Sequence, residues 1–130
     1  MKKIERSEIL DLGGYEAIRD RFKQRMIEMK KRRRTAVGEH MTLVWENRDT
    51  VLFQIQEMLR TERITNERGI AHEIATYNDL IPDAGELSAT LMIEYDDPAE
   101  RAQAGDVLAG LGEHFWIEVR EVMGSGDDMR

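Results

Sequence analysis

Cysteine is absent from this sequence, and only two of its 130 residues are proline. Without cysteine the chain can form no disulfide, thiolate nucleophile, cysteine-type zinc site or self-ligated iron–sulfur cluster. No apolar run reaches the length that crosses a bilayer. The basic start, MKKIERSEIL, lacks the apolar stretch of a signal peptide. These absences together predict a cytoplasmic protein with no membrane span.

Acidic and basic residues are divided unequally along the chain, whose net charge is −7. Residues 1–34 contain 12 of the 19 basic side chains and 6 acids, whereas the remainder contains 7 arginines and 20 acids. Opposite charges in two parts of one chain favour contact, within the fold or between subunits. The acidic total argues against nonspecific nucleic-acid binding, which needs a dominant basic face.

Helices are predicted where apolar residues recur every three or four positions. The first is expected to begin at Tyr15, after a break at Gly13–Gly14, and to end in the basic run Lys30–Arg34. A second is expected to be capped by Asp49 or Thr50.

A third helix is expected to follow the turn at Thr65–Glu67 and to stop before Pro82, which cannot continue it. It forms a helical hairpin with the second helix. A fourth helix, with Asp97 at its N-cap, is expected over residues 98–109.

Strands are predicted where apolar and polar residues alternate, in EHMTLVWEN, ELSATLMIEY and HFWIEVR. The resulting order is helix, strand, two helices, strand, helix, strand. It predicts an α+β domain, a small mainly antiparallel sheet of about three strands covered by about four helices. We expect this single domain to span residues 1–122 and residues 123–130 to form a flexible tail.

The stretch IAHEIATYND suggests chemistry because His72 and Glu73 begin like a zinc-protease helix. Position i+4 holds Thr76 instead of a second histidine, so that motif is absent. If the two hairpin helices pair antiparallel, Glu57 lies level with Glu73, and Glu57, His72 and Glu73 could bind a divalent metal. The alternative interpretation is that His72 is a surface or interface histidine.

Charged residues suggest two further features, each with a structural and a functional interpretation. Glu62 lies on the apolar side of its helix and could form an ion pair with Arg68 that locks the hairpin, or be an acid with a shifted pKa in a pocket. The run Lys30, Lys31, Arg32, Arg33 and Arg34 could complete a charge match within the protein or a dimer, or bind phosphate or nucleic acid.

Trp45 and Trp116 lie on predicted strands, and Trp116 lies on the face opposite Phe115 and Ile117. A sheet that is apolar on both faces needs helices on both or a partner surface. We therefore expect the two tryptophans to contribute to a partner surface, and we expect a homodimer.

Four long strings resemble a known bacterial family: RDRFKQRMIEMKKRRR, VGEHMTLVWENRDTVLFQIQEMLRTERI, HEIATYNDLIP and ELSATLMIEY. They are similar to the domain-of-unknown-function 3501 family over roughly residues 4–119. Members are expected to continue beyond the strand HFWIEVR, so the resemblance implies a shortened member or a piece of a longer chain. The family has no established activity or catalytic residues to carry over.

The resemblance implies a context, an iron-linked redox or peroxide-handling system with rubrerythrin-like proteins and iron–sulfur or flavin oxidoreductases. In that context we expect a non-catalytic accessory protein that acts by binding a protein partner and needs no cofactor. A His/Glu metal-binding protein or metal-dependent enzyme is the first alternative. A nucleic-acid binder acting through the basic helix end is the second.

Overall fold

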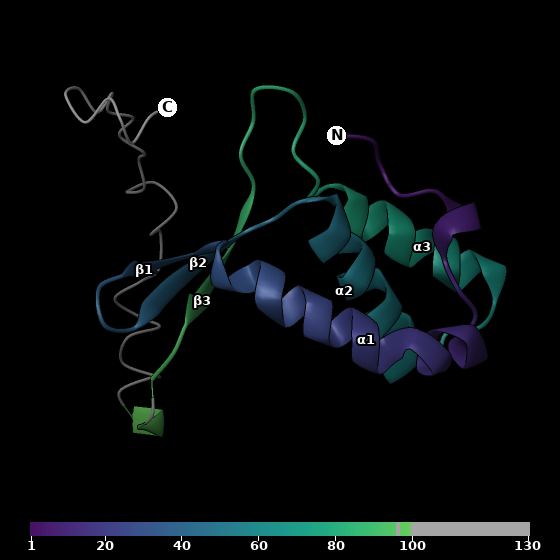
Figure 1. Cartoon of the computed structure of the whole chain (residues 1–130), viewed down its shortest axis with the longest axis horizontal. Coiled ribbons are helices and arrows are strands. Elements are labelled where there is room, and N and C mark those ends of the chain that lie inside the picture. Colours follow the sequence, from purple (N-terminus) through teal and green to yellow (C-terminus); the bar gives the residue numbers. More distant parts are fainter. Residues whose placement is uncertain (96, 100–130) are drawn as a thin grey trace. The chain divides into compact units, whose positions relative to one another are not determined.

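The computed structural model describes residues 1–95 and 97–99. The chain divides after Glu94 into two units, 1–94 and 95–130. The first unit contains three α-helices and a three-stranded antiparallel sheet, which confirms the predicted α+β class (Figure 1). In chain order the elements are η1 (Arg6–Glu8), α1 (Leu12–Lys31), β1 (Arg34–Val37), β2 (Met41–Trp45), α2 (Arg48–Thr61), α3 (Glu67–Asn78) and β3 (Ala89–Ile93).

The second unit is described only in part. The Asp97 carboxylate accepts a hydrogen bond from the Ala99 backbone N–H at 2.9 Å, as expected of a helix N-cap. The rest of the predicted helix over 98–109, the predicted strand HFWIEVR and the predicted tail at 123–130 lie outside the described residues. The extent of the predicted single domain, residues 1–122, stays a prediction.

Helix α1 begins three residues earlier than predicted, because Gly13 and Gly14 belong to its first turn. The Asp11 carboxylate caps the helix by accepting from the Gly14 N–H at 2.7 Å. A Cβ at Gly14 would lie only 3.0 Å from this carboxylate. The glycine pair, predicted to be a break, therefore leaves room for the cap. Tyr15 and Met26, which lie about three turns apart on the apolar side of the helix, are buried.

The predicted helical hairpin is formed by α2 and α3, and α2 packs against both α1 and α3. The prediction of Asp49 or Thr50 as the cap of α2 is wrong. Asn47 is the N-cap, and its carboxamide accepts from the Thr50 N–H at 2.9 Å while the Thr50 hydroxyl accepts from the Asn47 N–H. This reciprocal capping box satisfies two amides that have no partner within the helix.

The connection between α2 and α3 reverses the chain within five residues. Arg63 has a positive φ of 52°, the Ile64 N–H donates to the Leu59 carbonyl at 2.9 Å, and the Arg63 N–H donates to the Arg60 carbonyl at 3.3 Å. These two bonds form a Schellman motif at the end of α2. Asn66 then caps α3 by accepting from the Gly69 N–H at 2.7 Å.

The hydrophobic core lies in the helical part of the unit. It combines the facing sides of α2 and α3 with two isoleucines of the N-terminal segment and one that follows α3. Its buried members are Ile4, Ile9, Val51, Ile55, Leu59, Ile70, Ile74 and Ile81. The predicted apolar faces of both hairpin helices therefore meet in one cluster.

The sheet has the order β1-β2-β3, and both neighbouring pairs are antiparallel. β1 was not predicted, because its first residue, Arg34, was assigned to the basic end of α1. Gly38, with φ +70°, occupies the turn that returns the chain to β2. Of the described strand residues only Val44 is buried, so the sheet adds little to the core.

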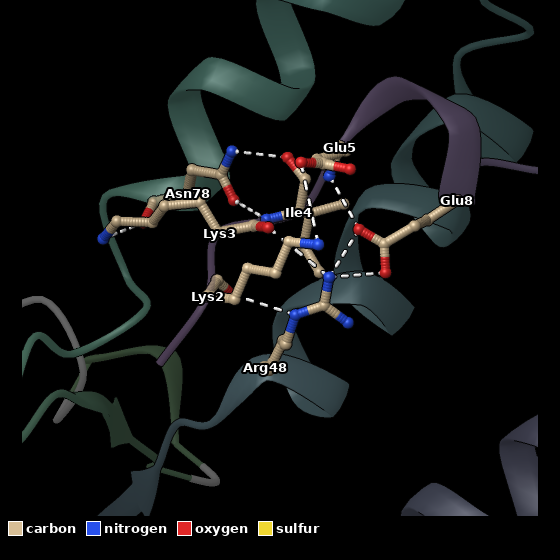
Figure 2. A network of polar contacts seen from close by, with 7 residues as sticks. All are labelled: Lys2, Lys3, Ile4, Glu5, Glu8, Arg48 and Asn78. Carbon is tan, nitrogen blue, oxygen red and sulfur yellow. Dashed lines mark hydrogen bonds and ion pairs between the residues drawn. The ribbon is translucent and has the colours of Figure 1, made fainter.

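The N-terminal segment is held across α2 and α3 by a polar network (Figure 2). The Asn78 carboxamide accepts from the Ile4 N–H at 2.8 Å and donates to the Ile4 carbonyl at 3.0 Å. Gln56, which is only 1% exposed, pairs with the N–H and the carbonyl of Leu10 at 2.7 and 3.2 Å. Two side-chain amides thus satisfy the backbone of a segment that has no strand partner.

Charged contacts complete this attachment. The Arg48 guanidinium forms an ion pair with Glu8 and donates to the Lys2 carbonyl at 2.9 Å (Figure 2). Arg6 forms an ion pair with Glu67 of α3 at 2.7 Å. No helix in the described part is long and apolar enough to span a membrane.

Candidate partner-binding site

Glu57, the first residue of the predicted metal site, lies on the side of α2 that faces α1. Its carboxylate accepts two hydrogen bonds from the Arg19 guanidinium, both at 2.9 Å, and one from the Tyr15 hydroxyl at 2.6 Å. Arg19 and Glu57 are 20% and 23% exposed, whereas Tyr15 is fully buried. The cluster joins α1 to α2.

These contacts shift the ionisation of all three groups. The guanidinium of Arg19, aided by the Tyr15 hydroxyl, holds the pKa of Glu57 below its ordinary value despite partial burial. The hydrogen bond to Glu57 raises the pKa of Arg19. Burial, together with the bond to Glu57, raises the pKa of Tyr15. Glu57 is therefore a charged structural acceptor, and the enclosed Tyr15 cannot meet a substrate.

The structure does not bring Glu57, His72 and Glu73 together. His72 is exposed on α3 and Glu73 is half-buried, while Glu57 is directed toward α1 by its bonds to Arg19 and Tyr15. Within residues 1–95 and 97–99 no three His, Asp or Glu side chains are placed to hold a metal ion. The hairpin forms, but it does not gather these three side chains.

Glu62 and Arg68 are not arranged as predicted. Glu62 is the C-cap of α2 and is exposed, as is Arg68 near the start of α3. No ion pair within 4.0 Å joins them among the contacts of the described residues. The hairpin is held instead by its apolar faces and by the Schellman motif.

The basic run Lys30–Arg34 is distributed over three structural positions. Lys30 and Lys31 end α1, Arg32 is its C-cap, and Arg34 begins β1. The Arg33 guanidinium donates to the Trp45 carbonyl at 2.7 Å and to the Glu46 carbonyl at 3.2 Å, and so ties the helix end to β2. Only part of this predicted patch is therefore available to a ligand.

Two phenylalanines where α1 packs against α2 each make a cation–π contact. The Phe22 and Phe53 rings meet edge to face, with centroids 5.4 Å apart. The Arg25 guanidinium lies 5.7 Å from the Phe22 centroid, and the Lys30 ammonium lies 5.5 Å from the Phe53 centroid. The negative faces of aromatic rings attract such cations. The contacts hold both charges at the surface of the helix pair.

A groove of about 450 Å³ lies beside this aromatic pair. We call it the α1 groove; its lining residues are Lys23, Met26, Ile27, Lys30, Lys31, Arg34 and Phe53. Three of these side chains are apolar and four are cations. Lys31 forms an ion pair with Glu28 at 2.9 Å, whereas Lys23, Lys30 and Arg34 form none with the described acids.

The predicted tryptophan surface can be followed for one of its two members. Trp45 is half-buried, and its indole N–H donates to the Thr35 hydroxyl at 2.9 Å. Its side of the sheet continues through the pairs Leu43–Leu91 and Met41–Ile93, which makes that face apolar. Trp116 lies outside the described residues, so a role for it stays a prediction.

Several residues that shape this site were missed in the sequence. Arg19 lies one turn after Tyr15 on α1, so the i, i+4 spacing could have indicated that both face α2. Phe53 lies off the main apolar stripe of α2, so apolar periodicity does not indicate that it packs against Phe22. The backbone-binding roles of Gln56 and Asn78 depend on where the N-terminal segment runs, which no local pattern reveals.

The chain is similar to proteins whose function is unknown. Residues 3–126 match the family described as "Protein of unknown function (DUF3501)". A crystal structure of a "novel protein of unknown function" from Burkholderia pseudomallei K96243 is 39% identical, with a TM-score of 0.79. The match covers 82% of this chain and 60% of the solved chain. No curated protein matches. The chain belongs to the DUF3501 family.

Proposed function

We propose that this protein is a non-catalytic accessory protein that binds an acidic partner protein through the surface around the α1 groove. The observation that carries this proposal is the excess of cations there. From Arg21 to Arg34 the sequence holds eight basic residues and one acid. Such a local field attracts an acidic surface and speeds its association.

The polar side chains that could take part in chemistry are instead engaged in structural hydrogen bonds, which supports a binding role. Glu57 is saturated by Arg19 and Tyr15, and Gln56 and Asn78 are paired with backbone groups. These groups are engaged in contacts that stabilise the fold. The grooves of α1 instead combine cations with exposed apolar surface, which is typical of interaction sites.

The partner class is taken from the family resemblance. It implies an iron-linked redox or peroxide-handling system, with rubrerythrin-like proteins or iron–sulfur or flavin oxidoreductases as partners. A chain without cysteine would rely on such a partner for any iron–sulfur cluster. This part of the proposal rests on the resemblance and on composition alone.

The test is a binding titration with purified rubrerythrin-like protein and iron–sulfur oxidoreductase from the same organism. Sedimentation velocity should detect a complex with one of them that weakens as salt is raised, because exposed charges are screened. The same experiment reports the homodimer that we expect for the free chain. Peroxide turnover by the purified chain alone, or no complex with either class at low salt, would contradict the accessory role.

A further inference from the structure

We propose that the α1 groove binds a short amphipathic segment of a partner protein that carries carboxylates around one or two large aliphatic or aromatic side chains. This inference rests on the proposed function and adds to it the chemistry of the bound segment. It also assigns a role to each kind of lining residue, the cations to the carboxylates and the apolar side chains to the apolar ones.

The groove is suited to a ligand of mixed character. Its cations Lys23, Lys30, Lys31 and Arg34 come from positions spread over more than two turns of α1 and the start of β1. Lys30 is further held in place by the Phe53 ring. None of the described residues that line the groove is an acid. A single small anion would meet only part of this array, whereas a segment with several carboxylates can meet all of it.

The apolar lining supplies the second requirement. Ile27 is 44% exposed although it is a large aliphatic residue on a helix, whereas its neighbour Met26 is buried. Phe53 is half-buried beside them. An apolar side chain placed on this surface removes its own area and that of Ile27 from water, which favours binding. A site that bound its ligand by charge alone would not need this apolar surface.

The same groove is poorly suited to a nucleic acid. Binding of single strands depends on aromatic faces that are free to stack with bases. The Phe53 ring already has the Lys30 ammonium 5.5 Å from its centroid and Phe22 against it at 5.4 Å. The net charge of −7 also repels an extended polyanion. A short protein segment places fewer charges near the acidic part of the chain.

Fluorescence anisotropy with labelled synthetic peptides tests the proposal without knowledge of the natural partner. The first peptide is helical and has leucine on one face and glutamate elsewhere. A second replaces each glutamate by glutamine, a third replaces each leucine by alanine, and an oligothymidylate tests nucleic acid. We expect the first peptide to bind best and the other two to bind about tenfold more weakly.

Variants of the full chain locate the binding. Lys30→Glu and Ile27→Glu should each weaken the first peptide by about tenfold. Arg68→Glu, an equal charge reversal at an exposed position on α3, should change binding by no more than about twofold. Backbone amide shifts in the bound state should map to residues 23–34 and to Phe53. Circular dichroism confirms that each variant is folded.

Three results would overturn the inference: equal binding of all three peptides, tighter binding of the oligothymidylate, or amide shifts that avoid the groove. The outcome is separable from that of the proposed function. A wild-type chain that binds no redox partner counts against the proposed function. A partner complex that is unaffected by both Lys30→Glu and Ile27→Glu leaves the accessory role standing and rules out the α1 groove as its binding surface.

Discussion

Arg63 is the one described residue other than glycine with a positive φ, 52°. A left-handed conformation costs a residue with a side chain about 1–2 kcal/mol, because the Cβ crowds the following carbonyl. The Schellman motif at the end of α2 requires this conformation, since it directs the Ile64 N–H back to the Leu59 carbonyl. The side chain of Arg63 is exposed and contributes little to packing.

We predict that Arg63→Gly stabilises the protein by about 0.5–1 kcal/mol, because glycine removes the Cβ strain while its greater freedom in the unfolded chain offsets part of the gain. The measurement is the urea midpoint of unfolding. Arg21→Gly is the matched control, since Arg21 is exposed in the middle of α1, where glycine should cost about 1 kcal/mol. A loss of stability in Arg63→Gly would refute the explanation.

The second prediction concerns the Glu57 carboxylate. Glu57→Gln should reduce the free energy of unfolding by about 2 kcal/mol, because the Arg19 guanidinium and the Tyr15 hydroxyl lose a charged acceptor. Chemical denaturation measures the change. Glu62→Gln, at the exposed C-cap of α2, should be nearly neutral and serves as the control. Equal effects of the two substitutions would show that the cluster is not structural.

The sequence alone could identify which residues were chemically notable but not what each one contacts. Glu57 was assigned to a metal site with His72 because both lie on the hairpin. The choice between α1 and α3 as the neighbour of Glu57 depends on the rotation of α2 about its own axis. That rotation is fixed by the packing of the buried residues Val51, Ile55 and Leu59. The apolar pattern of α2 alone does not indicate which neighbouring helix each of its faces contacts.

At the scale of elements, the α2–α3 connection depends on Gly69. A Cβ at this position would lie 2.7 Å from Ile64 Cγ2 and 3.1 Å from the Asn66 carboxamide oxygen. The first of these atoms packs against the core, and the second caps α3. A side chain would therefore disturb the turn and the cap together.

We predict that Gly69→Ala lowers the free energy of unfolding by about 1–3 kcal/mol, the usual cost of overpacking. Gly13→Ala is the matched control. A Cβ there finds its nearest neighbour at 3.9 Å, so alanine should be neutral or stabilising by up to about 1 kcal/mol. Thermal unfolding of both variants provides the comparison, and similar midpoints would contradict the role given to Gly69.

The elements that the sequence predicted well are those with strong apolar periodicity, the helices and the strands β2 and β3. β1 was missed because Arg34 and Thr35 carry no apolar alternation, and only pairing with Val44 and Leu43 makes this segment a strand. The cap of α2 was misplaced because several adjacent residues are good N-caps. The backbone geometry of Asn47, extended at φ −141°, makes the choice among them.

At the scale of the whole molecule, ionisation links stability to pH. Hydrogen bonds from Arg48 hold the pKa of Glu8 below its ordinary value, as Arg19 does for Glu57 and Arg6 for Glu67. In the unfolded chain these carboxyls titrate near pH 4.3. Below that pH the unfolded state binds more protons than the folded state, so acid favours unfolding.

We therefore predict full stability from these contacts above about pH 5 and a progressive loss as the pH falls through 4.3 and lower. Urea titrations at several pH values measure this dependence. Glu57→Gln removes one of the carboxyls and should make the acid loss shallower. Parallel pH profiles for the variant and the wild type would mean that other groups control the transition.

The attachment of the N-terminal segment has a consequence for how the protein is made. Ile4 and Leu10 bond to Asn78 and Gln56, and Arg6 bonds to Glu67. Residues 4–10 therefore leave the ribosome before their partners in α2 and α3 have been synthesised. Until then Ile4 and Ile9, which end up buried, remain in water. This segment therefore completes its contacts only after the helices that follow it in the sequence are available.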